Sequence, residues 1–297
     1  MTTESLYSKG GLRIEIAQPH GMCTGVDRAL KIANRILDEY PNETLWCFHE
    51  IVHNQHVVAE MKSRGAIFVD AIATIPEGAR VLFSAHGVSP QIWEEARARK
   101  LDIVDATCPF VAKVHGEARD FASRHCHIAL VGHKGHDEVV GVIGEAPEQI
   151  EVIESKADVE ILKTRWPNER MLVLLSQTTI SDEMFVECQT ALESAGYTLI
   201  HPNFKDICYA TRERQRAVSQ LARNVDCVLV LGSPNSSNSR RLVEVAQKEG
   251  CQAFLIDKPE GVDGLDISQI KRIGVTSGAS TPEALFLQLI ERLKERV

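Results

Sequence analysis

The chain has 297 residues, of which 44% are hydrophobic and 25% are charged, and its formal net charge is −8. This is the composition of an ordinary globular protein, and it excludes a disordered chain, a collagen and a low-complexity linker. Apolar runs reach only about five residues, whereas a membrane span needs roughly 20, and no apolar signal sequence follows Met1. We therefore expect a cytoplasmic protein that does not bind membranes, and the acidic excess argues against nucleic acid as a partner.

Short aliphatic or β-branched runs alternate with amphipathic stretches along the chain. Residues 1–12 are polar and are expected to form a flexible extension. Six strands are expected to run into small polar loops, at 13–21, 81–87, 128–136, 172–179, 228–238 and 273–280. Six more are expected at 45–48, 67–69, 103–104, 151–153, 197–200 and 253–256. The runs are continuous rather than alternating, which is typical of parallel strands with helices on both faces.

About twelve strands are too many for one compact sheet in a chain of this length, and they divide into three groups of four. The strand that begins the chain is the odd one and completes the last group. We therefore expect an α/β fold of three similar small domains with parallel sheets. Their ranges are 26–108, 109–205, and 206–297 together with 13–25.

Short polar side chains gather where the expected strands end and helices begin. They are His86, His133, His136, Gln177, Thr178, Thr179, Ser236, Ser237, Asn238 and Ser280. Parallel sheets bind ligands at this edge, and helix N-termini offer backbone N–H groups to anions. Each residue alone is most simply a helix N-cap, but their recurrence at nearly every junction favours an anion site.

The eight cysteines are of two kinds. Five lie within or beside expected strands and helices, where free cysteine is a small buried hydrophobe: Cys47, Cys126, Cys188, Cys227 and Cys251. The other three, Cys23, Cys108 and Cys208, lie in strand-to-helix loops. No two cysteines have ribbon or ferredoxin spacing, so spacing leaves open one metal site shared by three domains or three unrelated loop cysteines.

Eight motifs follow one another in the order of a known family. They are HGMCTGVDRA at 20–29, HEIVHN at 49–54, FSAHGVS at 83–89, DATCP at 105–109, SQTT at 176–179, DICYAT at 206–211, GSPNSSNS at 232–239 and GVTSGAS at 274–280. With them the chain resembles the 4-hydroxy-3-methylbut-2-enyl diphosphate reductases, the IspH/LytB family, from about residue 13 to about residue 293.

This resemblance implies three domains in a pseudo-threefold trefoil around a central cluster cavity. It also implies one 4Fe-4S cluster per chain, held by Cys23, Cys108 and Cys208, with one iron not ligated by protein. The substrate hydroxyl would leave as water, giving isopentenyl and dimethylallyl diphosphate in the last step of the non-mevalonate isoprenoid pathway. Electrons would come from a ferredoxin or flavodoxin. A cavity completed within one chain favours a monomer.

The resemblance also implies roles for individual residues. Glu138 would be the proton source, with Thr178 and His136 in its relay. The diphosphate would be bound by His53, His86, His136, Thr178, Ser236, Ser237, Asn238 and Ser280.

One motif departs from the family pattern. The usual GHPEVEG reads GHDEVVG at 135–141, so that Asp137 replaces a proline and Val140 replaces a glutamate. We expect Asp137 to raise the pKa of Glu138 by like-charge repulsion. Two alternatives remain open: a cluster-dependent dehydratase of another diphosphate on the same scaffold, and a non-catalytic iron–sulfur sensor. The sensor is disfavoured because it needs the cysteines but neither Glu138 nor the anion-binding residues.

Overall fold

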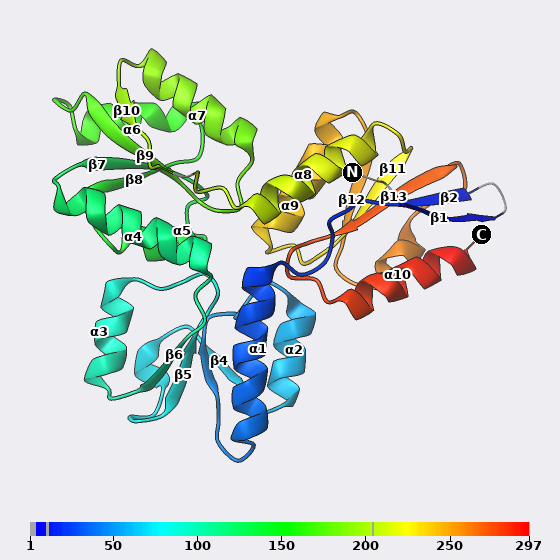
Figure 1. Cartoon of the computed structure of the whole chain (residues 1–297), viewed down its shortest axis with the longest axis horizontal. Helices are drawn as coiled ribbons and strands as arrows, with labels where there is room; N and C mark the ends of the chain where they lie inside the picture. Colours follow the sequence, from blue (N-terminus) through cyan, green and yellow to red (C-terminus); the bar gives the residue numbers. More distant parts are fainter. Residues whose placement is uncertain (1–3, 10–11, 204, 297) are drawn as a thin grey trace. The chain divides into compact units, whose positions relative to one another are not determined.

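The computed structural model describes residues 4–9, 12–203 and 205–296, and it contains three sheets flanked by helices (Figure 1). The chain divides into two compact units, which are described separately. The terminal unit comprises Met1–Val26, His53–Val57 and Tyr209–Val297. The central unit comprises Asp27–Val52 and Val58–Cys208. The predicted α/β class with three sheets is confirmed.

The first sheet of the central unit has four parallel strands in the order β4-β3-β5-β6. Its strands are β3 (Trp46–Phe48), β4 (Ile67–Val69), β5 (Arg80–Phe83) and β6 (Asp102–Asp105), and the short helix η1 (Ile72–Thr74) follows β4. Helix α3 (Pro90–Ala98) packs against one face, where Phe48, Val81 and Phe83 are buried. Helices α1 (Thr24–Glu39) and α2 (Gln55–Ser63) lie on the other side of this sheet (Figure 1).

The second sheet of the central unit has the parallel order β10-β9-β7-β8. Its strands are β7 (His127–Val131), β8 (Ile150–Ile153), β9 (Met171–Ser176) and β10 (Thr198–Ile200). Its helices are α4 (Pro109–Ser123), α5 (Asp137–Ile143), η2 (Lys156–Asp158), α6 (Val159–Arg165) and α7 (Asp182–Ser194). Ile128 and Leu130 pack toward α4 and α5, whereas Ala129 and Val131 pack toward α6 and α7. Apolar residues on both faces explain why the strand sequence is continuous rather than alternating.

The terminal unit holds the third sheet, in the order β1-β2-β13-β11-β12. Its strands are β1 (Glu4–Lys9), β2 (Leu12–Ile16), β11 (Cys227–Leu231), β12 (Gln252–Ile256) and β13 (Arg272–Ser277). Its helices are α8 (Tyr209–Ala222), α9 (Ser237–Lys248), η3 (Pro259–Gly264) and α10 (Glu283–Glu295). Leu229 and Leu231 pack with α10, and Val228 and Val230 pack with α8 and α9. Strand β2 pairs in parallel with β13, so the first predicted strand does complete the last group.

The beginning of the chain corrects the sequence analysis. We expected residues 1–12 to be a flexible extension, but Glu4–Lys9 forms strand β1, paired antiparallel with β2. A backbone ladder needs no apolar side chains, so the polar composition misled the prediction. The Gly10-Gly11 pair between the two segments was the sequence signal for a hairpin.

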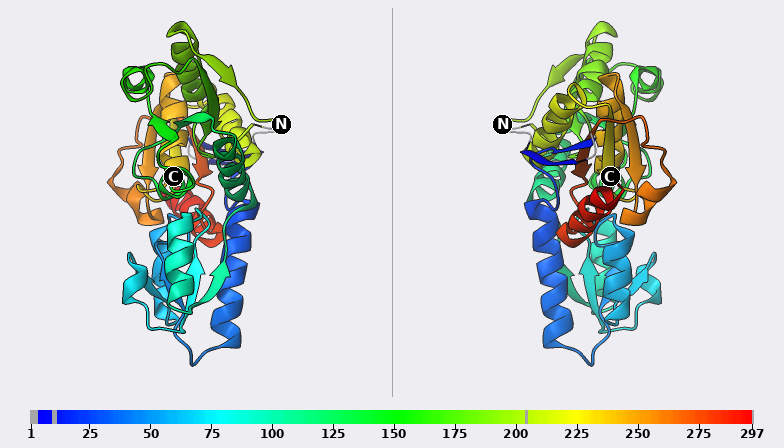
Figure 2. Two further views of the ribbon diagram at one scale, coloured as in Figure 1. Left: turned by 90° about the vertical axis from the view of Figure 1, so that its left-hand side faces the viewer. Right: turned by 90° about the vertical axis from the view of Figure 1, so that its right-hand side faces the viewer.

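The twelve predicted strands are all present, and Figure 2 shows the strands of the three sheets with helices beside them. Each of the three predicted domain ranges contains one parallel sheet, whereas compactness groups the chain into two units. The division into three domains therefore stays a prediction. No helix of the described part of the chain is both long enough and apolar enough to cross a membrane.

Candidate active site

A buried glutamic acid lies in the first turn of helix α5. Glu138 is 2% exposed, and its carboxylate accepts two hydrogen bonds from Thr178, from the backbone N–H at 2.6 Å and from the hydroxyl at 2.9 Å. The adjacent strands β7 and β9 place the pair, because Glu138 follows one and Thr178 follows the other. Burial raises the pKa of Glu138 to about 7, although the bonds from Thr178 lower it. Such a carboxyl is protonated in a large fraction of molecules at neutral pH and can act as a general acid.

A second buried carboxylate, Asp206, contributes to this raised pKa. Its Oδ2 accepts the backbone N–H of Ser176 at 2.9 Å, and its Oδ1 lies 2.8 Å from Lys113 Nζ. The charge of Asp206 raises the pKa of Glu138 further. We had assigned that effect to Asp137, and this assignment is wrong. Consecutive helical residues point in different directions, so the side chain of Asp137 faces other groups.

His136 is the N-cap of helix α5. Its Nδ1 accepts the backbone N–H of Glu138 at 3.2 Å. An accepting Nδ1 carries no proton, so the ring proton lies on Nε2, where the imidazole is a donor. The ring of His136 meets that of His86 edge to face, with centroids 5.6 Å apart. The structure therefore brings together His86, His136, Glu138 and Thr178 within the central unit.

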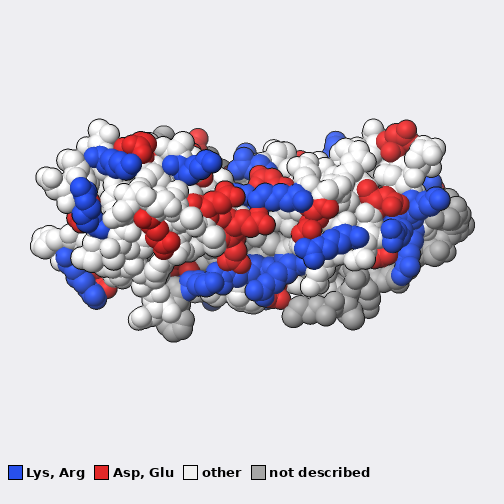
Figure 3. Space-filling model, turned by 90° about the horizontal axis from the view of Figure 1, so that it is seen from above, with Lys and Arg blue, Asp and Glu red and all other residues white. Residues whose placement is uncertain are grey.

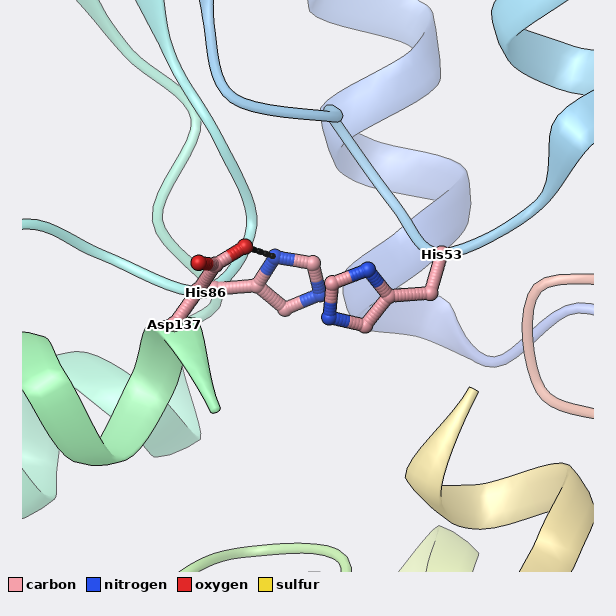
Figure 4. A group of neighbouring side chains, drawn as sticks. All are labelled: His53, His86 and Asp137. Carbon is pink, nitrogen blue, oxygen red and sulfur yellow. Dashed lines mark ion pairs between the residues drawn. The ribbon is translucent and has the colours of Figure 1, made fainter. Parts of the chain in front are cut away.

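Asp137 lies between two histidines of the first sheet. Its Oδ1 accepts a hydrogen bond from His49 Nδ1 at 3.0 Å. Its Oδ2 lies 3.8 Å from His86 Nδ1, an ion pair drawn in Figure 4. The hydrogen bond to Asp137 raises the pKa of His49, against the lowering effect of burial. The residue that departs from the family pattern thus forms ion pairs with imidazoles instead of repelling Glu138.

Five predicted anion-binding residues lie in the terminal unit: His53, Ser236, Ser237, Asn238 and Ser280. Ser236 caps helix α9, because its Oγ accepts the backbone N–H of Ser239 at 3.3 Å. Asn238 is 4% exposed, yet neither polar atom of its amide has a hydrogen-bond partner among the described residues. A buried amide of this kind needs a polar ligand, because leaving it without one costs about 1–3 kcal/mol.

Ser280 connects two segments of this predicted set. Its hydroxyl donates to the backbone carbonyl of His53 at 3.0 Å. It lies just beyond strand β13, and the cap of α9 lies beyond the adjacent strand β11. Five of the eight predicted diphosphate-binding residues are therefore in the terminal unit and three, His86, His136 and Thr178, are in the central unit.

The three loop cysteines are half-buried, and backbone hydrogen bonds hold their loops in place. The N–H of Cys23 donates to the carbonyl of Ala279 at 3.0 Å, and the Sγ of Cys23 lies 3.5 Å from the N–H of Val26. Cys108 is the N-cap of helix α4, and its N–H donates to Ala85.

The third loop cysteine is connected to the buried acid. The N–H of Cys208 donates to the carbonyl of Thr178 at 3.1 Å, and Thr178 holds Glu138. Thiolates from loops fixed in this way are suitable ligands for an iron–sulfur cluster. Cys23 belongs to the terminal unit, whereas Cys108 and Cys208 belong to the central unit.

The other cysteines have a different environment. Burial raises the pKa of Cys47 and Cys227 to about 12 and that of Cys188 to about 11. It also raises the pKa of Cys251. A thiol with such a pKa stays protonated and is a poor metal ligand. These four are core residues, as expected, whereas the fifth, Cys126, is only half-buried, so its expected place in the core is wrong.

Two residues of this site were missed from the sequence. His49 lies in the HEIVHN motif, which gave no sign of its partner. That partner, Asp137, lies in a helix that packs on the other sheet of the central unit. Asp206 was considered only as the start of the DICYAT motif. The signal that the sequence offered is its place two residues before Cys208.

Comparisons with known proteins give one answer. A family model described as LytB protein matches residues 14–294. The 4-hydroxy-3-methylbut-2-enyl diphosphate reductase of Streptomyces avermitilis is 46% identical, over 98% of this chain and 86% of that protein. The enzyme of the same name from Mycobacterium ulcerans is 46% identical, over 95% of this chain and 85% of that protein.

A solved structure has the same fold. It is that of the E-1-hydroxy-2-methyl-but-2-enyl-4-diphosphate reductase from Plasmodium falciparum, which superimposes with a TM-score of 0.87 at 34% identity. The match covers 95% of this chain and 87% of that one. With sequence and fold in agreement over nearly its whole length, the chain belongs to the LytB family.

Proposed function

We propose that this protein reduces 4-hydroxy-3-methylbut-2-enyl diphosphate to isopentenyl diphosphate and dimethylallyl diphosphate, the last step of the non-mevalonate pathway. The reaction consumes two electrons and two protons and releases the substrate hydroxyl as water. The observation that carries the proposal is the buried acid Glu138, with its pKa of about 7 and its two bonds from Thr178. Relatives 46% identical to the chain carry the name of this reductase.

The proposed cofactor is one 4Fe-4S cluster per chain, held by Cys23, Cys108 and Cys208, with one iron not ligated by protein. Three half-buried cysteines in fixed loops fit this donor set, whereas Cys47 and Cys227 stay protonated in the core. When bound, the cluster supplies electrons and a Lewis-acidic iron for the substrate hydroxyl.

The proposed diphosphate ligands are His53, His86, His136, Thr178, Ser236, Ser237, Asn238 and Ser280. Support comes from the buried amide of Asn238, which has no partner among the described residues. Helix α9 adds backbone N–H groups at its N-terminus, and its macrodipole favours an anion there. His136 adds a ring N–H donor, because its Nδ1 is already an acceptor.

Glu138 is the proposed proton donor. Its hydrogen bonds with Thr178 orient the carboxyl, and the Thr178 hydroxyl both donates and accepts, so it can pass a proton onward. The raised pKa keeps Glu138 protonated in a large fraction of molecules at neutral pH. The backbone bond from Glu138 to His136 positions the imidazole beside the acid.

The electron donor is proposed to be a ferredoxin or flavodoxin, because the sequence has no nicotinamide-binding fingerprint. Acidic and basic side chains are interspersed over the face drawn in Figure 3, which offers both signs of charge to a protein partner. A cytoplasmic monomer remains our proposal for compartment and assembly.

The test begins with protein purified without oxygen. Visible and EPR spectra recorded with and without 4-hydroxy-3-methylbut-2-enyl diphosphate should show a cluster whose signal changes on binding. Cys108→Ser should abolish the cluster, whereas Cys188→Ser, a buried control, should keep it. A folded wild-type protein that stays colourless after anaerobic reconstitution would overturn the proposal.

Glu138→Gln separates catalysis from sensing. The reductase should lose about 10²–10⁴ of its turnover while keeping cluster and substrate binding, because the general acid is gone. A sensor would be indifferent to this change. A cluster-containing protein that is blind to the substrate would instead favour the dehydratase of another diphosphate.

A further inference from the structure

Asp137 occupies the first position of helix α5, next to the N-cap His136. From there its carboxylate reaches into the other sheet of the central unit. One oxygen accepts a hydrogen bond from His49 Nδ1 at 3.0 Å. The other lies 3.8 Å from His86 Nδ1 (Figure 4). A single carboxylate therefore contacts the loop after β3 and the loop after β5.

The loop that carries His49 is held in a fixed conformation beside Asp137. His49 has a left-handed backbone, with φ of 60°, which costs a non-glycine residue of order 1 kcal/mol. Its ring stacks on Phe48 with centroids 4.2 Å apart, and its N–H donates to the carbonyl of Val69 at 2.9 Å. The surrounding contacts thus hold a strained residue with its imidazole toward Asp137.

A carboxylate at Nδ1 favours the imidazolium form of a histidine. An imidazolium keeps an N–H at Nε2 for an anion, whereas a neutral ring protonated at Nδ1 leaves Nε2 as an acceptor. Asp137 and Asp70 raise the pKa of His49 by their charge, and Asp137 and His136 lie beside His86. Asp137 is the group common to both histidines.

We propose that Asp137 is a positioning residue for the diphosphate, holding His49 and His86 in place and His49 in the charged form that binds an anion. The inference rests on the proposed function, since it assigns His86 to that site. It gives a role to the residue at which this chain departs from the family's usual proline. Substrate affinity at neutral and alkaline pH then depends on Asp137, whereas the proton-donor step does not.

The test measures binding of inorganic diphosphate to the cluster-loaded protein by calorimetry, from pH 6 to pH 8. Asp137→Asn should raise the dissociation constant about 5- to 20-fold at pH 8 and only slightly at pH 6, where the His49 imidazole is protonated without help. KM for 4-hydroxy-3-methylbut-2-enyl diphosphate should rise in parallel, with kcat changed less than about threefold. Asp137→Pro, the family's usual residue, should behave like Asp137→Asn.

Two further variants make the result specific. Asp182→Asn removes an acidic residue from the same position of helix α7, and it should leave diphosphate binding unchanged. His49→Asn should weaken binding, and its effect should not add to that of Asp137→Asn, because the two residues act as a pair.

The outcomes also separate the two proposals. Wild-type protein that binds and turns over its substrate, with Asp137→Asn equal to it within twofold at every pH, would overturn only the role of Asp137. Wild-type protein that binds no diphosphate would overturn the proposed function, and the role of Asp137 with it. A defect of Asp137→Asn that is the same at every pH would refute the charge mechanism.

Discussion

At the scale of single residues, the burial of Glu138, the proposed proton donor, lowers the stability of the folded chain at neutral pH. Its pKa is about 7 in the folded chain, against an ordinary 4.5, so the folded state binds a proton that the unfolded chain has already released between these values. Stability is therefore complete below about pH 4.5 and falls as the pH rises through about 7. The loss is about 3 kcal/mol, since one pKa unit corresponds to about 1.4 kcal/mol.

Glu138→Gln should remove this loss. We expect the variant to gain up to about 3 kcal/mol of unfolding free energy over wild type at pH 8, and little at pH 5. Urea denaturation of the cluster-loaded proteins at both pH values measures the difference. Glu148→Gln, an exposed control, should show no such trend. A Glu138→Gln gain that does not depend on pH would contradict the linkage.

Thr178 lowers the pKa of Glu138, whereas burial raises it. Its hydroxyl donates to Glu138 at 2.9 Å and lowers the pKa of that carboxyl, so Thr178→Val should raise it. The alkaline limb of the kcat profile should move to higher pH, while kcat falls about tenfold through loss of the relay. Thr198→Val, at an exposed position of β10, is the control, and an unmoved limb would refute this effect of Thr178.

Sequence reasoning about residues succeeded where position within an element decides the environment. The core cysteines were separated from the loop cysteines because strands and helices bury their residues. It failed for Asp137, because nearness in sequence is not nearness in space on a helix. It also missed His49, whose partner Asp137 lies 88 residues away. The role of Glu138 came from the family resemblance alone.

At the scale of elements, the continuous apolar runs predicted the parallel strands well. Each strand of a doubly covered sheet must be apolar on both faces, and this leaves an unmistakable run of aliphatic residues. Strand β1 was not predicted, because an edge strand that is paired on one side needs only backbone hydrogen bonds and no apolar run. The close approach of α9 to the sheet could not be predicted from apolar residues either, because it depends on a glycine.

Gly278 makes that approach possible. A Cβ at this position would lie 2.1 Å from Ser239 Oγ, in the first turn of α9. Gly278→Ala should cost about 1–3 kcal/mol and weaken diphosphate binding, because it displaces the helix end that carries Asn238. Ser239→Ala should restore most of the loss in the double variant, as measured by urea denaturation and calorimetry.

Gly116→Ala is the matched control for this change. A Cβ at Gly116, in helix α4, meets no atom within 4 Å. The helix should gain about 0.5–1 kcal/mol from the better helix former. A loss at Gly278 that Ser239→Ala does not relieve would show that the contact with Ser239 is not its cause.

At the scale of the whole molecule, the proposed cluster is a ligand of the folded state. A ligand that binds only the folded chain raises its stability, so removal of the cluster by oxidation and chelation should lower the melting temperature by at least about 5 °C. Cys188→Ser should show the same drop. Cys108→Ser, without a cluster, should show none, and equal melting of loaded and stripped wild type would contradict this prediction.

Strand β1 has a consequence for how the protein behaves at high concentration. It pairs with β2 along Glu4–Lys9 and so occupies the hydrogen-bonding groups of one margin of the five-stranded sheet. Without it, β2 would present open N–H and C=O groups, and Leu12, Ile14 and Ile16 lie along that strand. Exposed strand margins of this kind recruit other chains and promote aggregation. The margin of the sheet is therefore formed by the segment ESLYSK, which has a charged residue at each end, instead of by the apolar strand β2. Deleting residues 1–9 should yield a protein that aggregates while its proposed catalytic residues are intact.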